Sequence, residues 1–336
     1  NLLKVGLPRL ENVFTVESLE KSSEKIRESI PEDISLIQYT SGSTGDPKGV
    51  VLTHANLISN IRGFAQALKI TSKDIGVSWL PLYHDMGLIG AWLSCLYLGI
   101  PIVIMSPQAF LNRPERWLWA IHHYRATLSA APNFAYELCL SKLNEKDLEG
   151  LDLSCWRAAL NGAEFVSLET VERFSSKFKD YGFRMESFLP VYGLAECSLA
   201  VTIPPLNRSP LYEKVNRIIF EKSGYAKLAD NKERNPLIFV STGRPLVKHD
   251  VRIVSEKGEV LACRSQGQIQ CRGASAMQGY FENNVATSGV LQGKWINTGD
   301  LGYLVDGELF VTGRIKDLII KGGRNIFPQE VEQATA

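Results

Sequence analysis

The chain has 336 residues, of which 45% are apolar and 22% are charged, and this balance is typical of globular proteins and excludes wholesale disorder. The 37 Lys and Arg residues oppose 36 Asp and Glu residues, so a net charge of +1 gives no support to a nucleic-acid or anionic-membrane partner. The length predicts about two domains.

The six cysteines never stand in the Cys-x-x-Cys spacing that is typical of zinc and thioredoxin-like sites. We therefore expect reduced, mostly buried thiols in a cytoplasmic protein. The chain begins at Asn1 without a leader of the secretory type, and we expect it to be an excerpt of a longer protein.

Strand and helix patterns alternate through the first two thirds of the chain. Residues 34–39 and 75–80 predict strands, and Thr53 is a candidate cap for a helix whose apolar residues recur with a period near 3.6. Further helices are predicted to begin near Pro114 and at Ser167. Alternating strands and helices predict an α/β fold with a mixed, mainly parallel sheet covered by helices.

Residues 86–112 carry no charge, which raises the question of a membrane span. Gly99 and Pro101 interrupt the run, and the helix predicted over 88–98 is far shorter than the roughly 30 Å of hydrocarbon requires. The sequence therefore predicts no membrane span. Instead, we expect a helix that is buried on all sides, followed by a buried parallel strand at 102–105.

The pattern changes after Pro204-Pro205. Residues 206–236 are polar and predict an irregular stretch, and short strands without helices between them follow at 237–240, 251–254, 267–271 and 308–312. Such a series predicts an added small β-barrel or sandwich. A last strand is predicted at 318–320, before the turn Gly322-Gly323.

The run YTSGSTGDPKG at residues 39–49 is the strongest chemical signal in the chain. Its glycines let backbone N–H groups converge on an anion, its hydroxyls add donors, and its lysine adds a charge suited to phosphate. Pro47 stands where a Walker A loop needs its second glycine, which disfavours a P-loop NTPase. The predicted phosphate-binding residues are Thr40, Ser41, Gly42, Ser43, Thr44, Gly45 and Lys48.

Four more motifs follow this loop in order: YGLAE at 192–196, TGD at 298–300, GRIKD at 313–317 and KGGRN at 321–325. With the loop, they resemble the phosphate-loop, Y-G-x-(T/A)-E, T-G-D and hinge motifs of the ANL superfamily, which contains acyl-CoA synthetases, nonribosomal-peptide adenylation domains and luciferases. Order and spacing agree across nearly the whole chain. The resemblance implies that the chain is most of the large domain of an adenylate-forming enzyme, and that this enzyme uses ATP and Mg²⁺.

Three features resemble one group of that superfamily, the fatty acyl-AMP ligases. The run LPLYHDMGL at 80–88 is similar to that group's L-P-x-x-H-D-M-G-L, and NGAE at 161–164 is similar to its N-G-A-E, although Phe165 replaces the proline expected next. The interval from Glu196 to Gly243 is longer than acyl-CoA synthetases usually show. We interpret residues 206–236 as the insertion that in these ligases obstructs the CoA-using conformation.

The resemblance implies roles at a nucleotide-binding end. Tyr192 would stack on adenine, Glu196 with Thr40 would bind Mg²⁺, and Asp300 would accept hydrogen bonds from the ribose hydroxyls. Arg314 would donate to ribose or phosphate. The predicted AMP-binding residues are Asn161, Gly162, Ala163, Glu164, Tyr192, Gly193, Leu194, Ala195, Asp300 and Arg314.

The resemblance also implies an acyl-binding end. His84 would lie near the carboxylate and the α-phosphate and stabilise developing charge, with Lys48 and Glu196 as the other catalytic candidates. The uncharged residues 86–98 are a candidate wall for a tunnel that binds a hydrocarbon tail. This region contains no carboxylate other than Asp85 that could balance an α-amino group, which disfavours amino-acid substrates. The predicted acyl-binding residues are His84, Asp85, Met86, Gly87 and Leu88.

We expect adenylation of a medium- to long-chain fatty acid by ATP and Mg²⁺, with release of pyrophosphate and transfer of the acyl group to an acyl carrier protein. Two alternatives stay open: an acyl-CoA synthetase of the same fold, and a non-catalytic module that binds adenylate or docks a carrier. The second is open because the catalytic lysine of the superfamily is expected beyond Ala336. Formation of a CoA thioester, or binding without turnover, would distinguish them.

The resemblance also predicts how the chain is divided. Residues 1–205 would form an α/β nucleotide- and acyl-binding part, 206–236 the insertion, 237–313 a β-barrel-like subdomain, and 314–336 the hinge and the start of a further domain. Asp317 is the predicted hinge residue.

Overall fold

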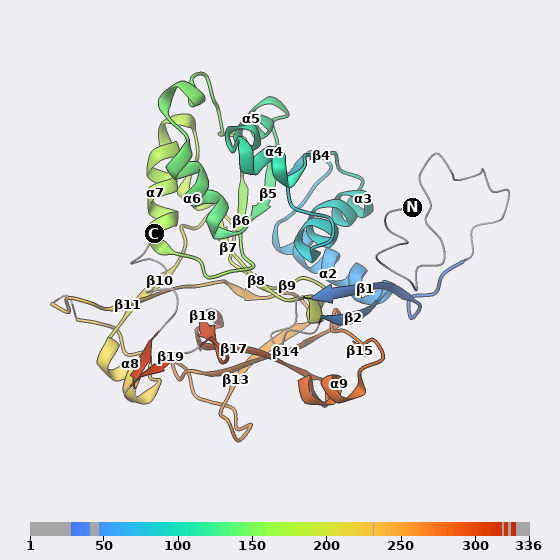
Figure 1. The fold of residues 1–336 in the computed structure, drawn as a ribbon, viewed down its shortest axis with the longest axis vertical. Coiled ribbons are helices and arrows are strands. Elements are labelled where there is room, and N and C mark those ends of the chain that lie inside the picture. Colours follow the sequence, from blue (N-terminus) through green and yellow to red (C-terminus); the bar gives the residue numbers. More distant parts are fainter. Residues whose placement is uncertain (1–27, 41–46, 231, 318, 322–323, 327–336) are drawn as a thin grey trace, which may run out of the picture. The chain divides into compact units, whose positions relative to one another are not determined.

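The computed structural model describes residues 28–40, 47–230, 232–317, 319–321 and 324–326. The contacts within the chain divide it after Pro31, and the elements below belong to the unit that begins at Glu32 (Figure 1). The predicted phosphate-loop residues 41–45 lie outside the described residues. Among the residues that are described, no helix combines the length and the apolar character that crossing a membrane requires.

A five-stranded parallel sheet forms the centre of the first part of this unit. Its strand order is β4-β3-β5-β6-β7, and every adjacent pair runs parallel. Neighbouring residues point to opposite faces, so Ala158 and Leu189 join one apolar core while Ala159 and Phe188 join the other. The strands are β3 (Gly76–Ser78), β4 (Ile102–Ile104), β5 (Leu128–Ala131), β6 (Ala158–Asn161) and β7 (Phe188–Pro190).

The helices α5, α6 and α7 cover one face of the sheet (Figure 1), and their buried side chains form an aromatic core there. Trp117, Tyr136 and Phe174 are fully buried and meet edge to face, with the ring centroids of Trp117 and Tyr136 5.4 Å apart. The helix starts predicted at Pro114 and Ser167 are confirmed as N-caps. The helices are α4 (Pro107–Asn112), α5 (Glu115–His123), α6 (Asn133–Lys142) and α7 (Leu168–Phe178).

The opposite core contains α2 (His54–Ala67), the π-helix η2 (Met86–Leu93) and α3 (Ser94–Leu98). Thr53 caps α2 as predicted and forms a capping box with Asn56. The expectation that the 88–98 helix is buried on all sides is wrong, because only the side carrying Ile89 and Cys95 faces the core. Its other side exposes several large side chains: Trp92 (41%), Leu96 (69%) and Tyr97 (41%). The strand predicted after it is β4, a half-exposed edge strand.

Antiparallel strands dominate the rest of the unit. A curled five-stranded sheet has the order β13-β14-β17-β16, with β18 also paired to β17, and smaller sheets have the orders β1-β2-β15 and β12-β9-β8. The predicted α/β fold with an added β subdomain is confirmed. The bounds are β1 (Ile34–Thr40), β2 (Lys48–Thr53), β8 (Tyr192–Gly193), β9 (Ala200–Ile203), β12 (Arg244–Pro245), β13 (His249–Val254), β14 (Gly267–Gly273), β15 (Gly279–Tyr280), α9 (Asn284–Val290), β16 (Leu291–Gln292), β17 (Trp295–Val305) and β18 (Glu308–Arg314).

Residues 206–236 are more ordered than the sequence predicts. They contain β10 (Tyr212–Val215), which pairs with β11 (Leu237–Val240), and α8 (Arg217–Ser223). Val215 and Phe220 join a separate buried cluster with Phe239, Tyr303 and Phe310. The expectation of an irregular stretch is therefore wrong for these elements, because a few apolar residues among polar ones are enough to pack them on the antiparallel sheet.

The last described residues form a hairpin of β19 (Ile319–Lys321) and β20 (Arg324–Ile326). This confirms the strand that the sequence predicts near 318–320. The glycine turn between the two strands lies outside the described residues.

Candidate active site

A cavity of about 550 Å³ begins beyond the carboxyl ends of the parallel strands β6 and β7 and extends along the sheet as far as Gly76 and Leu128, the first residues of β3 and β5. Residues of β8, β9, β17 and β18 also line it. Ligands of open parallel sheets bind at such carboxyl ends. The cavity brings together predicted residues that lie far apart in the chain: Thr40, Lys48, His84, Asp85, Met86, Ala163, Tyr192, Gly193, Leu194, Ala195, Glu196, Asp300, Arg314 and Asp317.

Asp300 is the buried centre of one end of this cavity. Tyr192 donates its hydroxyl to Asp300 Oδ2 at 2.7 Å, and Arg314, directly opposite on β18, donates Nε to Oδ1 at 2.9 Å. The charge of Asp300 raises the pKa of the Arg314 guanidinium, and burial together with that charge raises the pKa of the Tyr192 hydroxyl. A carboxylate offers about four acceptor positions, so Asp300 retains capacity for further hydroxyl donors.

Glu196 belongs to the same end and is fixed by Tyr280. The Tyr280 hydroxyl donates to Glu196 Oε1 at 2.6 Å, and burial raises the pKa of Tyr280, which keeps it a donor. The ring of Tyr280 lies 5.3 Å from Lys48 Nζ, because β15 pairs with the strand that begins at Lys48. Tyr280 thus contacts both the carboxylate of Glu196, through its hydroxyl, and the ammonium group of Lys48, through its ring.

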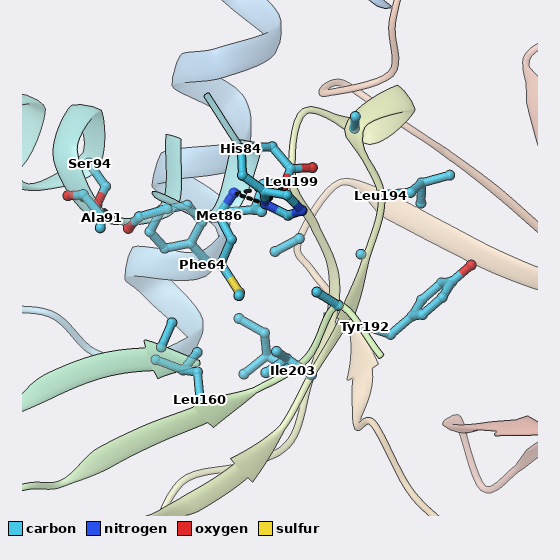
Figure 2. Close-up of a pocket in the computed structure, with 18 of the residues that line it drawn as sticks. Phe64, His84, Met86, Ala91, Ser94, Leu160, Tyr192, Leu194, Leu199 and Ile203 are labelled. Atoms are coloured by element: carbon cyan, nitrogen blue, oxygen red, sulfur yellow. Dashed lines mark hydrogen bonds and ion pairs between the residues drawn. The ribbon is translucent and has the colours of Figure 1, made fainter. Parts of the chain in front are cut away.

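His84 lies where the cavity changes from polar to apolar. Its Nδ1 lies 2.8 Å from Asp85 Oδ1, and this hydrogen bond raises the pKa of His84 above its usual value. Asp85 also caps η2 by accepting from the Met86 amide at 2.7 Å. The side chain of His84 is 51% exposed, so it is held by Asp85 but stays accessible to a ligand (Figure 2).

The opposite end of the cavity is apolar. No charged side chain on α2, β3, β5, η2 or α3 is among the described residues that line it. Burial raises the pKa of the Cys95 thiol to about 11, so that thiol is neutral, and the Ser94 hydroxyl donates back to Gly90 O at 2.6 Å. This end suits a hydrocarbon chain (Figure 2), and its lining includes Phe64, Leu68, Val77, Met86, Ala91, Ile100, Leu128, Leu160, Leu199 and Ile203.

The geometry can be compared with known proteins. Residues 6–281 match the family of AMP-binding enzymes. The chain belongs to that family. It is 39% identical over 335 residues to the medium-chain-fatty-acid--[acyl-carrier-protein] ligase TtuA of Teredinibacter turnerae, a match that covers 95% of this chain and 51% of TtuA. The chain spans about half the length of the curated relatives it matches.

Solved structures of AMP-binding enzymes show the same fold. A structure from a study of fatty acyl-adenylate ligases from E. coli and L. pneumophila superposes with a TM-score of 0.91 at 42% identity, covering 95% of this chain and 58% of that one. The fatty acyl-adenylate ligase from L. pneumophila in complex with acyl adenylate and pyrophosphate has a TM-score of 0.82 at 39% identity, with 90% and 53% covered. The resemblance to fatty acyl-AMP ligases is thereby confirmed.

Several predicted AMP-binding residues do not line the cavity of this family member. Asn161 is fully buried and donates Nδ2 to Asn133 Oδ1 at 3.0 Å, and Glu164 accepts from the Phe134 amide at the start of α6. Gly162 lets the chain pass within contact of Val191, because a Cβ there would lie 2.9 Å from the Val191 carbonyl oxygen. These three residues support the wall that carries Ala163.

Two predicted acyl-binding residues also lie outside the lining. A Cβ on Gly87 would strike the Pro81 carbonyl, so this glycine permits the tight turn into η2. Leu88 packs against the core that contains α2. Of the predicted acyl set, the structure therefore brings His84, Asp85 and Met86 to the cavity.

Tyr280 is a site residue that could not be identified from the sequence. It lies 84 residues from Glu196, and no motif named above includes it. Its role depends on the pairing of the two-residue strand β15 with β2, which a local pattern cannot reveal. The only local signal is an aromatic residue directly after a glycine, at Gly279-Tyr280.

The site fits Mg²⁺ with a bound nucleotide better than Mg²⁺ alone. Among the described residues, no group of three or more His, Cys, Asp or Glu side chains could hold a metal. Mg²⁺, however, commonly takes one or two carboxylates and completes its shell with phosphate oxygens and water. Glu196, half-buried at the cavity wall with Thr40 and Lys48 in the same lining, fits that arrangement.

Proposed function

We propose that the full-length protein carrying this chain converts a medium- to long-chain fatty acid and ATP into acyl-AMP and pyrophosphate. One observation carries the proposal: a single cavity runs from an end containing Asp300, Glu196 and Lys48 to an end without charge. An acyl-adenylate has the same division, because a charged, hydroxyl-rich nucleotide is joined to a hydrocarbon tail.

In this reaction a carboxylate oxygen attacks the α-phosphorus in line with the leaving pyrophosphate, so one P–O bond forms and one breaks. The protein contributes positioning and charge neutralisation. Asp300 would accept the ribose hydroxyls, with Tyr192 and Arg314 holding its carboxylate in place. His84, at the junction of the two ends, would donate to the oxygen on which charge develops, and its raised pKa favours the donor form.

Lys48 and Glu196 would manage the phosphates. The ammonium of Lys48 supplies a positive charge beside the predicted phosphate loop. Glu196 and Thr40 would hold Mg²⁺ against the phosphate oxygens, and the bound metal would neutralise charge on the leaving pyrophosphate. Tyr280 would keep the Glu196 carboxylate in place through the hydrogen bond described above.

We further propose that the acyl group passes to the phosphopantetheine thiol of an acyl carrier protein rather than to CoA. Support comes from residues 206–236, which are anchored on the antiparallel sheet. Arg264 donates hydrogen bonds from Nη2 and Nη1 to the two carboxylate oxygens of Glu213, at 2.7 and 3.1 Å. Arg208 forms an ion pair with Glu308, with Nη2 3.0 Å from Oε2. A segment held in this way suits a fixed obstruction to the conformation in which acyl-CoA synthetases use CoA.

We also propose a division of the chain into parts. Residues 1–205 would bind nucleotide and acyl chain, 206–236 would be the insertion, 237–313 the β subdomain and 314–336 the hinge region, with Asp317 as its hinge residue. Cytoplasmic location is supported by the six cysteines, which are described and free.

The proposal is tested by pyrophosphate release from ATP with the full-length protein. Dodecanoate should support release in the presence of Mg²⁺, and leucine, the control for amino-acid substrates, should not. Acyl transfer is then followed to holo acyl carrier protein and to CoA. Release with leucine but not with dodecanoate would reject the substrate class, and efficient acyl-CoA synthesis would favour the acyl-CoA synthetase alternative.

A further inference from the structure

The backbone directly after Glu196 adopts an uncommon conformation. Ser198 has φ 65° and ψ −56°, and the Leu199 amide donates to the Cys197 carbonyl at 2.8 Å, which makes a γ-turn centred on Ser198. This turn is rare for a residue with a side chain, and such a strained backbone conformation persists only where surrounding contacts hold it. Ser198 is fully buried, so those contacts come from the protein.

Asn60 on α2 supplies contacts on both sides of the γ-turn. Its Oδ1 accepts from the Ala200 amide at 3.0 Å, and its Nδ2 donates to the carbonyls of Cys197 at 3.1 Å and Ala200 at 2.8 Å. Asn60 is itself fully buried. One side-chain amide thus holds the backbone before and after Ser198.

Asn60 is the first member of a buried polar chain that continues through Ser275 and His249. Asn60 Nδ2 lies 3.1 Å from Ser275 Oγ, which lies 2.5 Å from His249 Nε2, while His249 Nδ1 lies 2.9 Å from the Val247 carbonyl oxygen. A carbonyl only accepts, so Nδ1 carries the hydrogen and Nε2 accepts from the Ser275 hydroxyl. Burial lowers the pKa of His249, which favours this neutral form.

The segment carrying Ser275 also holds the Glu196 loop directly. The Ser198 hydroxyl donates to the Ser275 carbonyl at 2.9 Å, and the Met277 amide donates to the Glu196 carbonyl at 2.8 Å. Gly273 faces His249 in the strand register, and a Cβ there would strike the imidazole. The sequence therefore leaves room for the histidine that ends the chain of hydrogen bonds.

We propose that Asn60, Ser275 and His249 are positioning residues that fix the Glu196 carboxylate by holding the γ-turn at Ser198. They are absent from the cavity lining, so they act through the Glu196 loop and not on a ligand. The inference rests on the proposed function in one respect, the role of Glu196 at the phosphate end.

The experiment compares His249→Leu and Ser275→Ala with wild type in the full-length protein. The affinity for ATP with Mg²⁺ and for AMP without metal is measured by calorimetry. Both variants should lose about tenfold in metal-dependent ATP affinity and keep their affinity for AMP. His249→Gln should recover most of the loss, because the amide oxygen of glutamine can accept from the Ser275 hydroxyl.

Ser241→Ala is the matched control. Like Ser275, Ser241 is buried and does not line the cavity, but its hydroxyl donates to Glu308 Oε2 at 2.6 Å and so belongs to a different hydrogen-bond network. It should lower thermal stability without changing the metal dependence of ATP binding. Equal effects of Ser241→Ala and Ser275→Ala on that dependence would overturn the positioning role.

Hydrogen exchange separates this inference from the proposed function. In ligand-free His249→Leu, the amides of Leu199, Ala200 and Met277 should exchange faster than in wild type, with amides of the α5–α7 core unchanged. Unchanged exchange at those three amides would contradict the proposal that His249 and Ser275 help to hold the γ-turn at Ser198. Absence of metal-dependent ATP binding in wild type, beside faster exchange in the variant, would reject the proposed function and with it the role in positioning Glu196.

Discussion

Asp300 links the side chains of Tyr192 and Arg314 at the nucleotide end, and these two neighbours define what the loss of its carboxylate should do. Both of its oxygens already accept a hydrogen bond from protein, one from Tyr192 and one from Arg314. Asp300 is 6% exposed, so a hydrogen bond that it accepts from a ribose hydroxyl would be shielded from competing water. Substitution at this position therefore acts on the ligand and on two neighbouring side chains together.

Asp300→Asn should weaken AMP binding by about tenfold, because one acceptor of a buried hydroxyl is replaced by a donor at a cost of about 1–3 kcal/mol. Calorimetric titration with AMP measures the change. Asp250→Asn is the control, since Asp250 is an exposed carboxylate that also pairs with an arginine, Arg272, at 2.8 Å. Unchanged AMP affinity in Asp300→Asn would contradict the ribose assignment.

Asp85→Asn should lower the pKa of His84, because the hydrogen bond from the imidazole to the Asp85 carboxylate is what raises it. The protonated His84 contributes to folded-state stability below its unfolded pKa, and this contribution disappears as pH rises through the higher folded pKa. An NMR titration of the imidazole follows the shift. The other four histidines are internal controls, and an unchanged His84 pKa would contradict the assigned pair.

Site residues that belong to a short, recognisable sequence motif could be predicted. Site residues that reach the cavity only through the pairing of distant strands could not. Tyr192, Glu196 and Asp300 stand in recognisable motifs, and the structure brings them to one cavity. Tyr280 reaches Glu196 only because β15 lies beside β2. The buried contacts of Asn60 depend in the same way on residues more than a hundred positions away.

At the scale of elements, the segment from Met86 to Leu98 shows what composition can and cannot predict. Its lack of charge correctly indicates an apolar wall, and Met86, Gly90 and Ala91 line the cavity. Its π-helical start could not be predicted, since π-helices are rare and have no recognisable sequence pattern here. Its exposed side could not be predicted, because an apolar sequence does not reveal how many of its faces pack against other elements.

Ala91→Trp should fill part of the apolar end and discriminate against long acyl chains. The affinity for a dodecanoyl sulfamoyl-adenosine should fall by at least tenfold, while that for the acetyl analogue should stay within about twofold. Leu96→Trp is the control, because Leu96 lies on the continuation of the same helix and is 69% exposed. An equal loss for both analogues in Ala91→Trp would place the acyl chain elsewhere.

At the scale of the whole molecule, Glu308 ties three parts of the chain together. It is 2% exposed, and it accepts hydrogen bonds from Arg208, Arg244 and Ser241. Burial favours its neutral form, but the hydrogen bonds from Arg208 and Ser241 and the charges of the two arginines outweigh burial and lower its pKa. The segment after β9 is thus fixed to β18 by a charge that the local sequence does not reveal.

Glu308→Gln should destabilise the protein by about 2 kcal/mol at pH 7, less than the loss of a fully buried ion pair because both arginines are partly exposed. A lowered pKa contributes stability above the unfolded pKa, and this contribution is lost as pH falls through the folded pKa. The difference between variant and wild type should therefore shrink in acid. Urea unfolding at pH 7 and pH 4 measures it, and a constant difference would contradict the role of the charge.

The architecture was more predictable than its details, because alternating strands and helices depend on local periodicity. The parallel sheet, the β subdomain and the capped helices follow from such patterns. The order within residues 206–236 was not predictable, because it depends on Phe220 meeting Phe239 and Tyr303 across the chain.

The central claim is that one continuous cavity binds an acyl-adenylate, with the nucleotide at Asp300 and the hydrocarbon beyond His84. The most direct test is calorimetric binding of sulfamoyl-adenosines carrying acetyl, octanoyl and dodecanoyl groups. Each methylene that enters the apolar end should contribute up to about 0.8 kcal/mol, or about fourfold in affinity, until that end is filled. Affinity that rises steeply from acetyl to octanoyl is the predicted result, and affinity that is independent of chain length would contradict the account.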